Sequence, residues 1–310
     1  MSRLVIATRK SPLALAQAEW VAERLAAQKP GLEVELKKII TQGDKILDVA
    51  LAKVGGKGLF VKEIEEALLR GEADLAVHSM KDVPAELPPG LVIAGVSPRE
   101  DVRDALVSRE GAGLAQLPLG ARIGTSSLRR GAQLLALRPD FEIVNVRGNV
   151  QTRLKKMEEL GLAAVVLASA GLSRLGLSHL ITERIGVQTI LPAVGQGALG
   201  LECRQDDQET RRLILGVSDP VAAAAVEAER AFLARLEGGC QVPIAGHAVV
   251  EGADLAFSGL VASLDGKQLV RGQGRAKKEK AANLGRRVAE DILERGAREI
   301  LAQVYGETPA

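Results

Sequence analysis

The chain has 310 residues, a formal net charge of +2, and 46% hydrophobic but only 2% aromatic residues. This length predicts two or three domains with aliphatic cores. A net charge near zero and few aromatic rings argue against nucleic-acid binding, which needs a basic surface and stacking platforms. The N-terminus runs directly into a strand-like segment, and no apolar run could span a bilayer, so we expect a cytoplasmic protein without membrane contact.

Strand-like and helix-like segments alternate along the first third of the chain. A strand over 3–8 precedes a helix that starts with Ser11 as N-cap and Pro12 as first helical residue, and continues to about Gln28. The following elements are predicted to be strand 32–40, loop 41–59, helix 60–70, strand 75–78 and strand 91–96. This alternation is typical of a largely parallel sheet with helices on both faces.

A charged segment at 97–103 predicts a hinge, after which a second α/β series begins. The predicted elements of this series are strand 121–124, helix 126–137, strand 141–146, helix 150–160 and strand 163–168. The pattern breaks again at 192–197, and the short strand 198–203 is expected to return to the first domain. After Pro220, a long helix, three strands near 245–250, 255–263 and 268–274, and a helix from about Lys278 are predicted.

These elements together predict two α/β domains followed by a C-terminal domain of α+β type. The expected boundaries are 1–98 with 198–216 for a discontinuous domain 1, 103–192 for domain 2, and 219–310 for domain 3.

Two glycine-rich motifs resemble phosphate-binding loops but lack the required context. Gly195 to Gly200 match G-x-G-x-x-G, yet a proline precedes them where a strand should run, and a strand-like segment follows where a helix should begin. We interpret this motif as a tight interdomain turn. Gly55 to Gly58 lack both a following Ser or Thr and an upstream strand, which favours a lysine-bearing loop rather than a nucleotide site.

Arginines recur where predicted strands end. Thr125 and Ser127 lie at a predicted helix start, directly before Arg129 and Arg130. The free N–H groups of a helix start favour an anion, whereas two arginines there oppose the helix dipole. An anionic ligand explains the pair; two solvated arginines are the alternative.

Further arginines follow other predicted strands. Arg9 with Ser11, Arg147 with Arg153, and Arg174 occupy such positions. Ligands of open α/β sheets bind at the carboxyl ends of strands, and arginine forks match carboxylates. The set predicts a ligand with several carboxylates.

Two reactive residues stand out beside these cations. Asp82 is the only acid in the polar cluster that ends strand 75–78, and such a carboxylate can accept a proton and stabilise a cation. A turn-capping role is the alternative for Asp82. Cys240 follows two glycines and precedes Pro243, which predicts an accessible thiol on a bent loop; a small buried residue is the alternative. The two cysteines and three widely spaced histidines predict neither a structural disulfide nor a metal site.

The motifs in this order resemble the porphobilinogen deaminase (hydroxymethylbilane synthase) family over essentially the whole chain. The matching stretches are IATRKSPLA at 6–14, GGKGLFVKE at 55–63, HSMKDVP at 78–84, GTSSLRR at 124–130, RGNVQTR at 147–153, PAVGQGALG at 192–200 and GGCQVP at 238–243. The departures are small: Ala7 stands where the family often has glycine, and Val102 stands where proline is common.

The resemblance implies a fold and an activity. The expected fold has two domains like those of periplasmic binding proteins around a cleft, plus the C-terminal α+β domain. The expected enzyme is a monomeric transferase of tetrapyrrole (haem) biosynthesis. It joins four porphobilinogen molecules head to tail with loss of ammonia, and water then frees the linear hydroxymethylbilane. The resemblance also implies a dipyrromethane cofactor bound to Cys240 through a thioether.

The resemblance further assigns roles to individual residues, with Asp82 as the catalytic group. The residues implied to bind the cofactor are Cys240, Lys81, Asp82, Thr125, Ser127, Arg129, Arg130 and Arg174. The residues implied to bind the substrate are Arg9, Ser11, Gln17, Phe60, Arg147 and Arg153. Phe60 and the loop with Lys53 and Lys57 are expected to cover the cleft. The rival functions are a non-catalytic binding module for a small polyanion and a thiol hydrolase, for which no base is placed beside Cys240.

Overall fold

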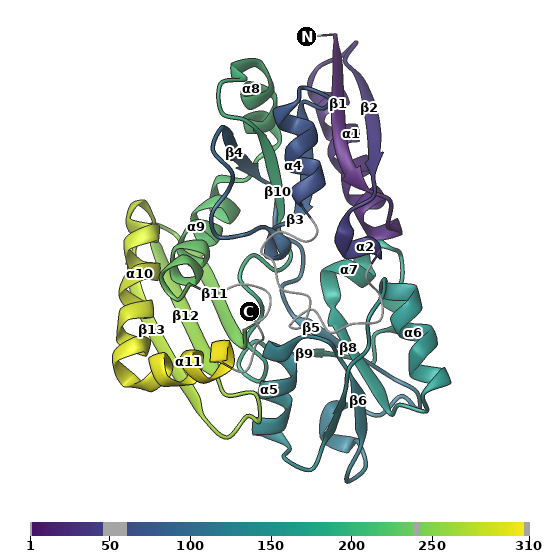
Figure 1. Ribbon diagram of the computed structural model, residues 1–310, viewed down its shortest axis with the longest axis vertical. Coiled ribbons are helices and arrows are strands. Elements are labelled where there is room, and N and C mark those ends of the chain that lie inside the picture. The colour runs from purple at the N-terminus through teal and green to yellow at the C-terminus, as the bar shows by residue number, and fades with distance from the viewer. Residues whose placement is uncertain (1, 46–60, 238–241, 307–310) are drawn as a thin grey trace.

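A computed structural model describes residues 2–45, 61–237 and 242–306 of the chain. Three sheets organise this part of the protein: two five-stranded sheets, here named the N-terminal and central sheets, and a three-stranded C-terminal sheet (Figure 1). The loop 55–58 and the side chains of Phe60, Lys53, Lys57 and Cys240 lie outside the described residues.

The N-terminal sheet has the strand order β2-β1-β3-β10-β4. Its strands are β1 (Arg3–Arg9), β2 (Glu33–Ile39), β3 (Leu75–Ser79), β4 (Leu91–Val96) and β10 (Leu199–Arg204). The helices of this half are α1 (Pro12–Gln28), α2 (Gln42–Lys45), α4 (Lys62–Leu69) and α8 (Gln208–Val217). Strand β10 runs antiparallel between β3 and β4, so the predicted return of the chain to this sheet is confirmed. The sheet is mixed rather than largely parallel, because β10 enters it from the central half in the opposite direction.

The central sheet has the order β7-β6-β8-β5-β9. Its strands are β5 (Asp104–Ser108), β6 (Arg122–Gly124), β7 (Glu142–Val144), β8 (Ala164–Ala168) and β9 (Glu183–Ile185), and its helices are α5 (Leu128–Leu137), α6 (Val150–Glu159) and α7 (Ser169–Arg174). Sequence analysis missed β5 and β9, since both are short and lie next to charged residues. Strand β5 runs antiparallel to β8 and β9, so this sheet is also mixed.

The two five-stranded sheets repeat one arrangement. In the N-terminal sheet β1 lies between β2 and β3, and in the central sheet β6 lies between β7 and β8. The strand beside β3 or β8 has crossed over from the other half: β10 in one sheet, β5 in the other. The two crossings run through residues 97–103 and 192–198, the segments predicted as a hinge and a tight turn. Gly197 has φ +90°, and a Cβ there would lie 2.4 Å from the carbonyl oxygen of Glu100, so the turn requires glycine. Because a turn and a strand follow, the motif is not a dinucleotide loop.

The C-terminal part matches the predicted α+β pattern. Its elements are α9 (Pro220–Arg235), β11 (Ile244–Glu251), β12 (Asp254–Ala262), β13 (Leu269–Lys277), α10 (Ala281–Ile292) and α11 (Arg298–Gly306). The strands form an antiparallel sheet, and helices α9 and α10 pack together against it (Figure 1). The buried rings of Phe232 and Phe257 meet at a centroid distance of 5.0 Å in this core. The helix predicted from Lys278 starts at Ala281 and is interrupted near Gly296, where φ is +104°.

Single 3₁₀ turns lie at Met80–Asp82, Leu114–Gln116, Ser178–Leu180 and Lys278–Lys280, and a π turn lies at Leu293–Ala297. The predicted N-cap Ser11 is confirmed, since its side chain accepts a hydrogen bond from the backbone N–H of Ala14. The N-cap of α5 is Ser127, which accepts from the N–H of Arg130, so this helix starts two residues later than expected.

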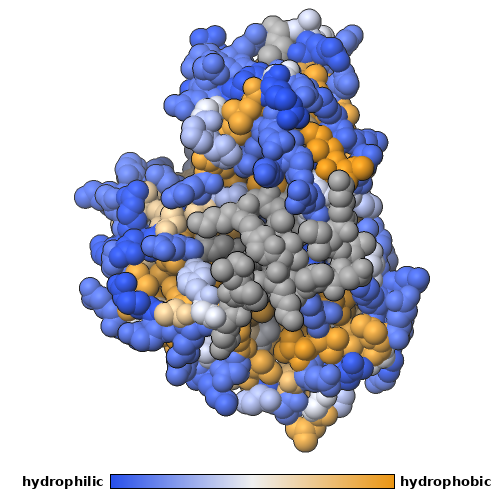
Figure 2. Space-filling model, in the orientation of Figure 1, coloured by the Kyte–Doolittle hydropathy of each residue, from blue (hydrophilic) through white to orange (hydrophobic). Residues whose placement is uncertain are grey.

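The face in Figure 2 is mostly hydrophilic, with apolar patches between the charged side chains. No helix within the described ranges is long and apolar enough to cross a membrane. The domain boundaries expected from the sequence stay predictions.

Candidate active site

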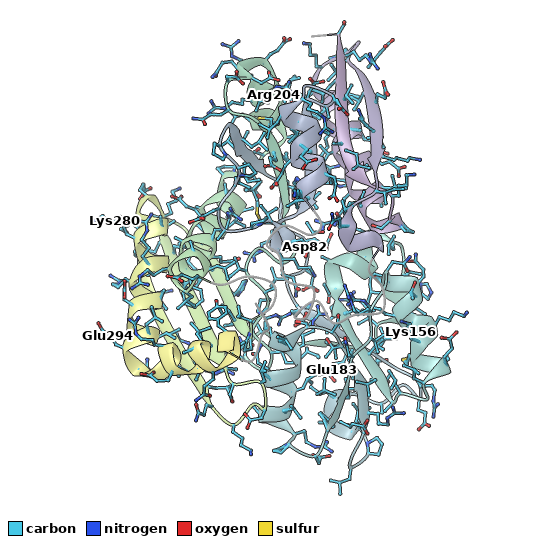
Figure 3. All side chains as sticks on the ribbon, viewed as in Figure 1. Asp82, Lys156, Glu183, Arg204, Lys280 and Glu294 are labelled. Atoms are coloured by element: carbon cyan, nitrogen blue, oxygen red, sulfur yellow. The ribbon has the colours of Figure 1, made fainter. Side chains whose placement is uncertain are left out.

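A cleft of about 580 Å³ is lined by both α/β halves of the molecule. Its positively charged lining residues number eight: Arg9, Lys10, Lys81, Arg130, Arg147, Arg153, Lys156 and Arg174. Among the lining residues that the structure describes, Asp82 is the only acid. Figure 3 places Asp82 near the middle of the molecule, between the N-terminal and central halves. A cleft with this balance of charge is suited to a ligand that carries several negative groups.

The backbone around Asp82 is held from two sides. Asp82 ends the 3₁₀ turn that follows β3, and the N–H of Met80 at the start of that turn donates to the carbonyl of Ala198 at 3.0 Å. On the other side, the guanidinium of Arg230 on α9 donates to the carbonyl of Pro84 at 2.9 Å and to that of Ala85 at 3.1 Å. The C-terminal helix α9 therefore helps to fix the segment that carries Asp82.

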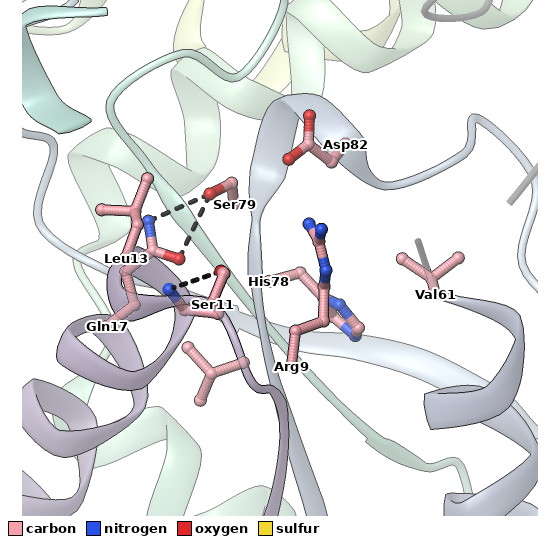
Figure 4. A pocket seen from close by; sticks show the side chains of 10 residues that line it. Arg9, Ser11, Leu13, Gln17, Val61, His78, Ser79 and Asp82 are labelled. Atoms are coloured by element: carbon pink, nitrogen blue, oxygen red, sulfur yellow. Dashed lines mark hydrogen bonds between the residues drawn. The ribbon is translucent and has the colours of Figure 1, made fainter. Parts of the chain in front are cut away.

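Residues from β1 and α1 form the N-terminal wall of the site (Figure 4). Arg9, Ser11, Gln17 and Asp82 line one small cavity of about 70 Å³, and all four also line the larger cleft. The amide nitrogen of Gln17 donates to the hydroxyl of Ser79 at 3.0 Å, which holds α1 against the end of β3. The structure thus brings together four residues that were predicted from separate motifs.

Arg153 and Lys81 contribute partly buried positive charge to the cleft. Burial, together with the charge of Arg130, lowers the pKa of Arg153 to about 10, and Asp82 opposes this shift. Burial and Arg130 also lower the pKa of Lys81 to about 8, again opposed by Asp82. Lys81 donates to the side-chain oxygen of Gln196 at 3.4 Å. Depressed pKa values at two cations indicate a site with too little negative charge, which an anionic ligand would supply.

Arg129 and Arg130 start the same helix but have different surroundings. Arg129 donates to the carboxylate of Asp104 at 2.8 Å and to the carbonyl of Leu191 at 2.6 Å, and it is not among the lining residues of the cleft. Arg130 also donates to Asp104, at 2.8 Å from NH2, yet it lines the cleft. Burial alone would raise the pKa of Asp104, but the two arginines outweigh it and hold that pKa well below its usual value.

Sequence analysis attributed this arginine pair to an external anion and missed Asp104. The carboxylate that pairs with both guanidinium groups belongs to the protein and starts β5. The signal in the sequence was weak: a single aspartate directly before the apolar residues 105–107.

Of the remaining predicted residues, some line the cleft and others do not. Thr125 accepts from the N–H of Ser127, and both stand at the start of α5 without lining the cleft. Arg174 lines the cleft and donates to the carbonyl of Gly197 at 2.7 Å, and burial lowers its pKa. Cys240 and Phe60 are not described, so the structure places only the elements that flank them: α9 and β11 around Cys240, and α4 after Phe60.

A buried network joins the C-terminal part to both crossing segments. The carboxylate of Glu229 on α9 accepts two hydrogen bonds from Arg99, at 2.6 and 3.0 Å, and one from the N–H of Gly195 at 2.6 Å. Gln196 in turn donates to Asp104 at 2.9 Å. Helix α9 is thereby linked to Gly195, which lines the cleft. None of these contacts was expected from the sequence.

Known families match both parts of the chain. Residues 4–212 match the family model "Porphobilinogen deaminase, dipyromethane cofactor binding domain", and residues 223–294 match "Porphobilinogen deaminase, C-terminal domain". The porphobilinogen deaminase of Syntrophotalea carbinolica is 60% identical over 97% of this chain and 96% of its own length. That of Geobacter sulfurreducens is 57% identical over 98% of this chain and 96% of its own length. The chain belongs to the porphobilinogen deaminase family.

Membership of this family decides between the functions that the sequence left open. The chain is a porphobilinogen deaminase: a transferase of tetrapyrrole biosynthesis with a dipyrromethane cofactor domain. The rival interpretations as a binding module or a thiol hydrolase are therefore set aside. Among solved structures, a methionine-binding protein aligns with 70% of this chain and 90% of its own at a TM-score of 0.43 and 14% identity. A likeness this weak adds nothing to the argument.

The cleft of the deaminase fits its cofactor and substrate chemically. Two linked pyrrole units carry two acetate and two propionate groups, and each incoming unit adds one of each. Eight cationic side chains in one cleft match such a load of carboxylates. No group of three or more His, Cys, Asp or Glu in the part of the chain that the structure describes could hold a metal ion.

Proposed function

We propose that this deaminase condenses four porphobilinogen molecules in the cleft, on a dipyrromethane held by a thioether to Cys240. The observation that carries this proposal is a cleft of about 580 Å³ with eight cations and, within its described lining, one acid. The monomeric state and the cytoplasmic location expected from the sequence are part of the proposal. When bound, the dipyrromethane supplies the pyrrole carbon at which the chain grows and the anchor that keeps the chain in place.

The cofactor carboxylates are assigned to cations from both sides of the cleft. Lys81, Arg130 and Arg174 line it and supply positive charge there. Arg129 acts indirectly in this proposal, because its guanidinium is bound to Asp104 and fixes the carboxylate that also orients Arg130. Ser127 acts in the same indirect way, by capping the helix that carries both arginines, and Thr125 accepts a hydrogen bond from the N–H of Ser127.

The incoming porphobilinogen is assigned to the N-terminal wall and to the start of α6. Arg9, Ser11 and Gln17 line both the cleft and the small cavity, while Arg147 and Arg153 face them from the central half. Phe60, which is not described, completes this group as the sequence predicts. Charged hydrogen bonds from these residues would hold the acetate and propionate groups and orient the aminomethyl carbon.

Asp82 is assigned the chemical role. Loss of ammonia from porphobilinogen leaves an electron-poor carbon beside a pyrrole N–H, and the new carbon–carbon bond forms there. The carboxylate of Asp82 can accept a hydrogen bond from a pyrrole N–H and stabilise the positive charge that develops on the ring. It can then accept the proton that the attacking pyrrole carbon loses, which restores the aromatic ring.

Mass spectrometry of the intact purified protein tests this proposal. We expect an excess mass equal to two linked pyrrole units, and peptide mapping should place it on Cys240. Cys240→Ser should fold but lack the stable adduct. Cys203→Ser is the matched control and should keep it, because Cys203 is buried in β10 and burial raises its pKa to about 11. An adduct on Cys203, or fully active enzyme with the bare chain mass, would overturn the proposal.

A further inference from the structure

Three buried titratable side chains interact near the end of β3. His78 on β3 lies with its Nε2 atom 2.8 Å from a carboxylate oxygen of Glu202 on β10. The two side chains are only 4% and 1% exposed. Glu65 on α4 is buried as well, and its charge interacts with those of His78 and Glu202. The function described so far uses none of the three.

Two oxygens of this cluster have no partner within the described residues. They are Oε1 of Glu65 and Oε1 of Glu202, and both are inaccessible to solvent. A buried carboxylate oxygen without a donor is costly, and the cost is relieved when the group takes up a proton. Burial, followed by the charge of Glu202, raises the pKa of Glu65 to about 7, while His78 opposes the shift. The cluster can therefore gain or lose a proton near neutral pH.

His78 also connects this cluster to the active site. Its side chain lines the cavity of about 70 Å³ whose other lining residues include Arg9 and Asp82. Figure 4 shows these three side chains around the same space. A cavity of this size can hold water. Because Asp82 and His78 both line it, water inside it would lie between the carboxylate and the imidazole.

The reaction requires such a path. In each condensation the attacking carbon loses one proton, and in the proposed function Asp82 accepts it. Asp82 must return to the carboxylate form before the next of the successive condensations can begin.

We propose that His78 is a proton-relay residue for Asp82, with Glu202 as its partner and Glu65 behind it. This inference rests on the role of Asp82 in the proposed function. Protonated Asp82 gives its proton, through water in the cavity, to the free ring nitrogen of His78. The products are the Asp82 carboxylate and an imidazolium whose Nε2–H is bonded to Glu202. The imidazolium later gives the proton up by the same path to the ammonia that leaves the next porphobilinogen, so each proton lost from carbon ends on one ammonia and none is gained or lost over the cycle.

Some of the charged groups around His78 favour its imidazolium form and others disfavour it. Asp82 across the cavity, Glu202 on β10 and Glu65 on α4 favour the imidazolium. Arg9 at the end of β1 disfavours it, and so does Arg230 on α9, whose charge interacts with Glu202. The carboxylate of Glu202 is the one in direct contact with the imidazole, as in other histidines that are oriented by a carboxylate.

His78→Gln tests the relay because it keeps a polar side chain but cannot carry a proton. Turnover should fall by about tenfold or more, within the usual range for lost proton-transfer groups. KM for porphobilinogen and the adduct mass should stay unchanged, since neither depends on proton transfer. The matched control is His179→Gln, which alters a histidine outside both cavities and should leave kcat unchanged.

Glu202→Gln keeps the shape of the cluster but removes the charge that favours the imidazolium. The acid limb of the kcat–pH profile should then move to lower pH, because the relay needs neutral histidine to start and the imidazolium loses its partner carboxylate. A merely structural role would lower the melting temperature and leave the shape of that profile unchanged.

The relay is overturned if His78→Gln keeps the wild-type kcat and pH profile, or if its only defect is a lower melting temperature or a higher KM. Failure of the proposed function has a different signature. In that case Asp82→Asn would remain active, or the adduct would be absent from active enzyme, whatever the behaviour of His78→Gln.

Discussion

The N-terminal and central halves share a strand arrangement and both present cations to the cleft, but within the described lining only the N-terminal half adds an acid. The central half presents arginines to the cleft and neutralises the deepest of them with one buried carboxylate, Asp104. The N-terminal half presents Asp82 and, behind it, the buried cluster of His78, Glu202 and Glu65. One scaffold therefore provides an anion-binding wall and a proton-handling wall, and the difference lies in a few side chains at equivalent edges.

The pKa values of two buried carboxyl groups show the difference between the two halves. Asp104 lies between two guanidinium groups, which hold its pKa well below the usual value despite burial. Glu65 lies near another carboxylate, and its pKa is raised to about 7. The same kind of group is thus permanently ionised in one half and titratable in the other, because the neighbouring charges differ in sign.

Asp104→Asn should break the anion-binding wall and produce the largest effect. Arg129 and Arg130 would keep their buried positive charges but lose the carboxylate between them. Breaking a buried ion pair costs about 3–5 kcal/mol, so denaturant unfolding should show a loss of that size. Glu142→Gln in the same sheet is the matched control, since its ion pair with Arg122 is exposed and should matter little. Equal stability of the two variants would contradict the role of Asp104.

Asp82→Asn should break the proton-handling wall without affecting the fold. The amide keeps the shape of the side chain but cannot accept a proton or stabilise a cation. Turnover should fall by about a hundredfold or more, which is typical of a lost acid–base or electrostatic group. Steady-state kinetics measures this loss, and thermal melting checks that the fold survives. Near-normal turnover in this variant would refute the assignment.

Glu65→Gln should change how the stability of the protein depends on pH, and its effect should be the smallest of the three. The folded-state pKa of about 7 lies above the ordinary value of 4.5, so the folded chain binds this proton more tightly than the unfolded chain. Wild-type stability should therefore fall as pH rises between these two values. The variant carries no such proton. The free energy of unfolding of the variant, relative to that of wild type, should therefore be about 1–3 kcal/mol higher at the alkaline end of this window than at the acid end.

Denaturant unfolding across this pH range measures the gain, with Glu66→Gln as the matched control. Glu66 lies on the same helix but is partly exposed beside Arg70, so its replacement should not change the pH dependence. A pH dependence of Glu65→Gln identical to that of wild type would show that Glu65 does not titrate in this window.

Local signals in the sequence predicted most elements of the fold. The Ser11–Pro12 cap, the break at Pro220 and the alternation of apolar runs depend on nearby residues, so α1, α9 and most strands appear close to their expected places. The short strands β5 and β9 were missed because pairing with neighbours from distant parts of the chain stabilises them. The antiparallel direction of β5 likewise depends on a crossing that no local pattern encodes.

The sequence by itself determined the family, the reaction and the chemical types in the site, because these depend on residue identity at fixed spacings within motifs. Only the tertiary structure decided which of those residues share the cleft. It turned Arg129 toward Asp104, 25 positions away in the chain, and left Arg130 at the cleft. It also joined His78 to Glu202, 124 positions away. Pairing and burial set the pKa values of these groups, and both arise only when distant segments pack together.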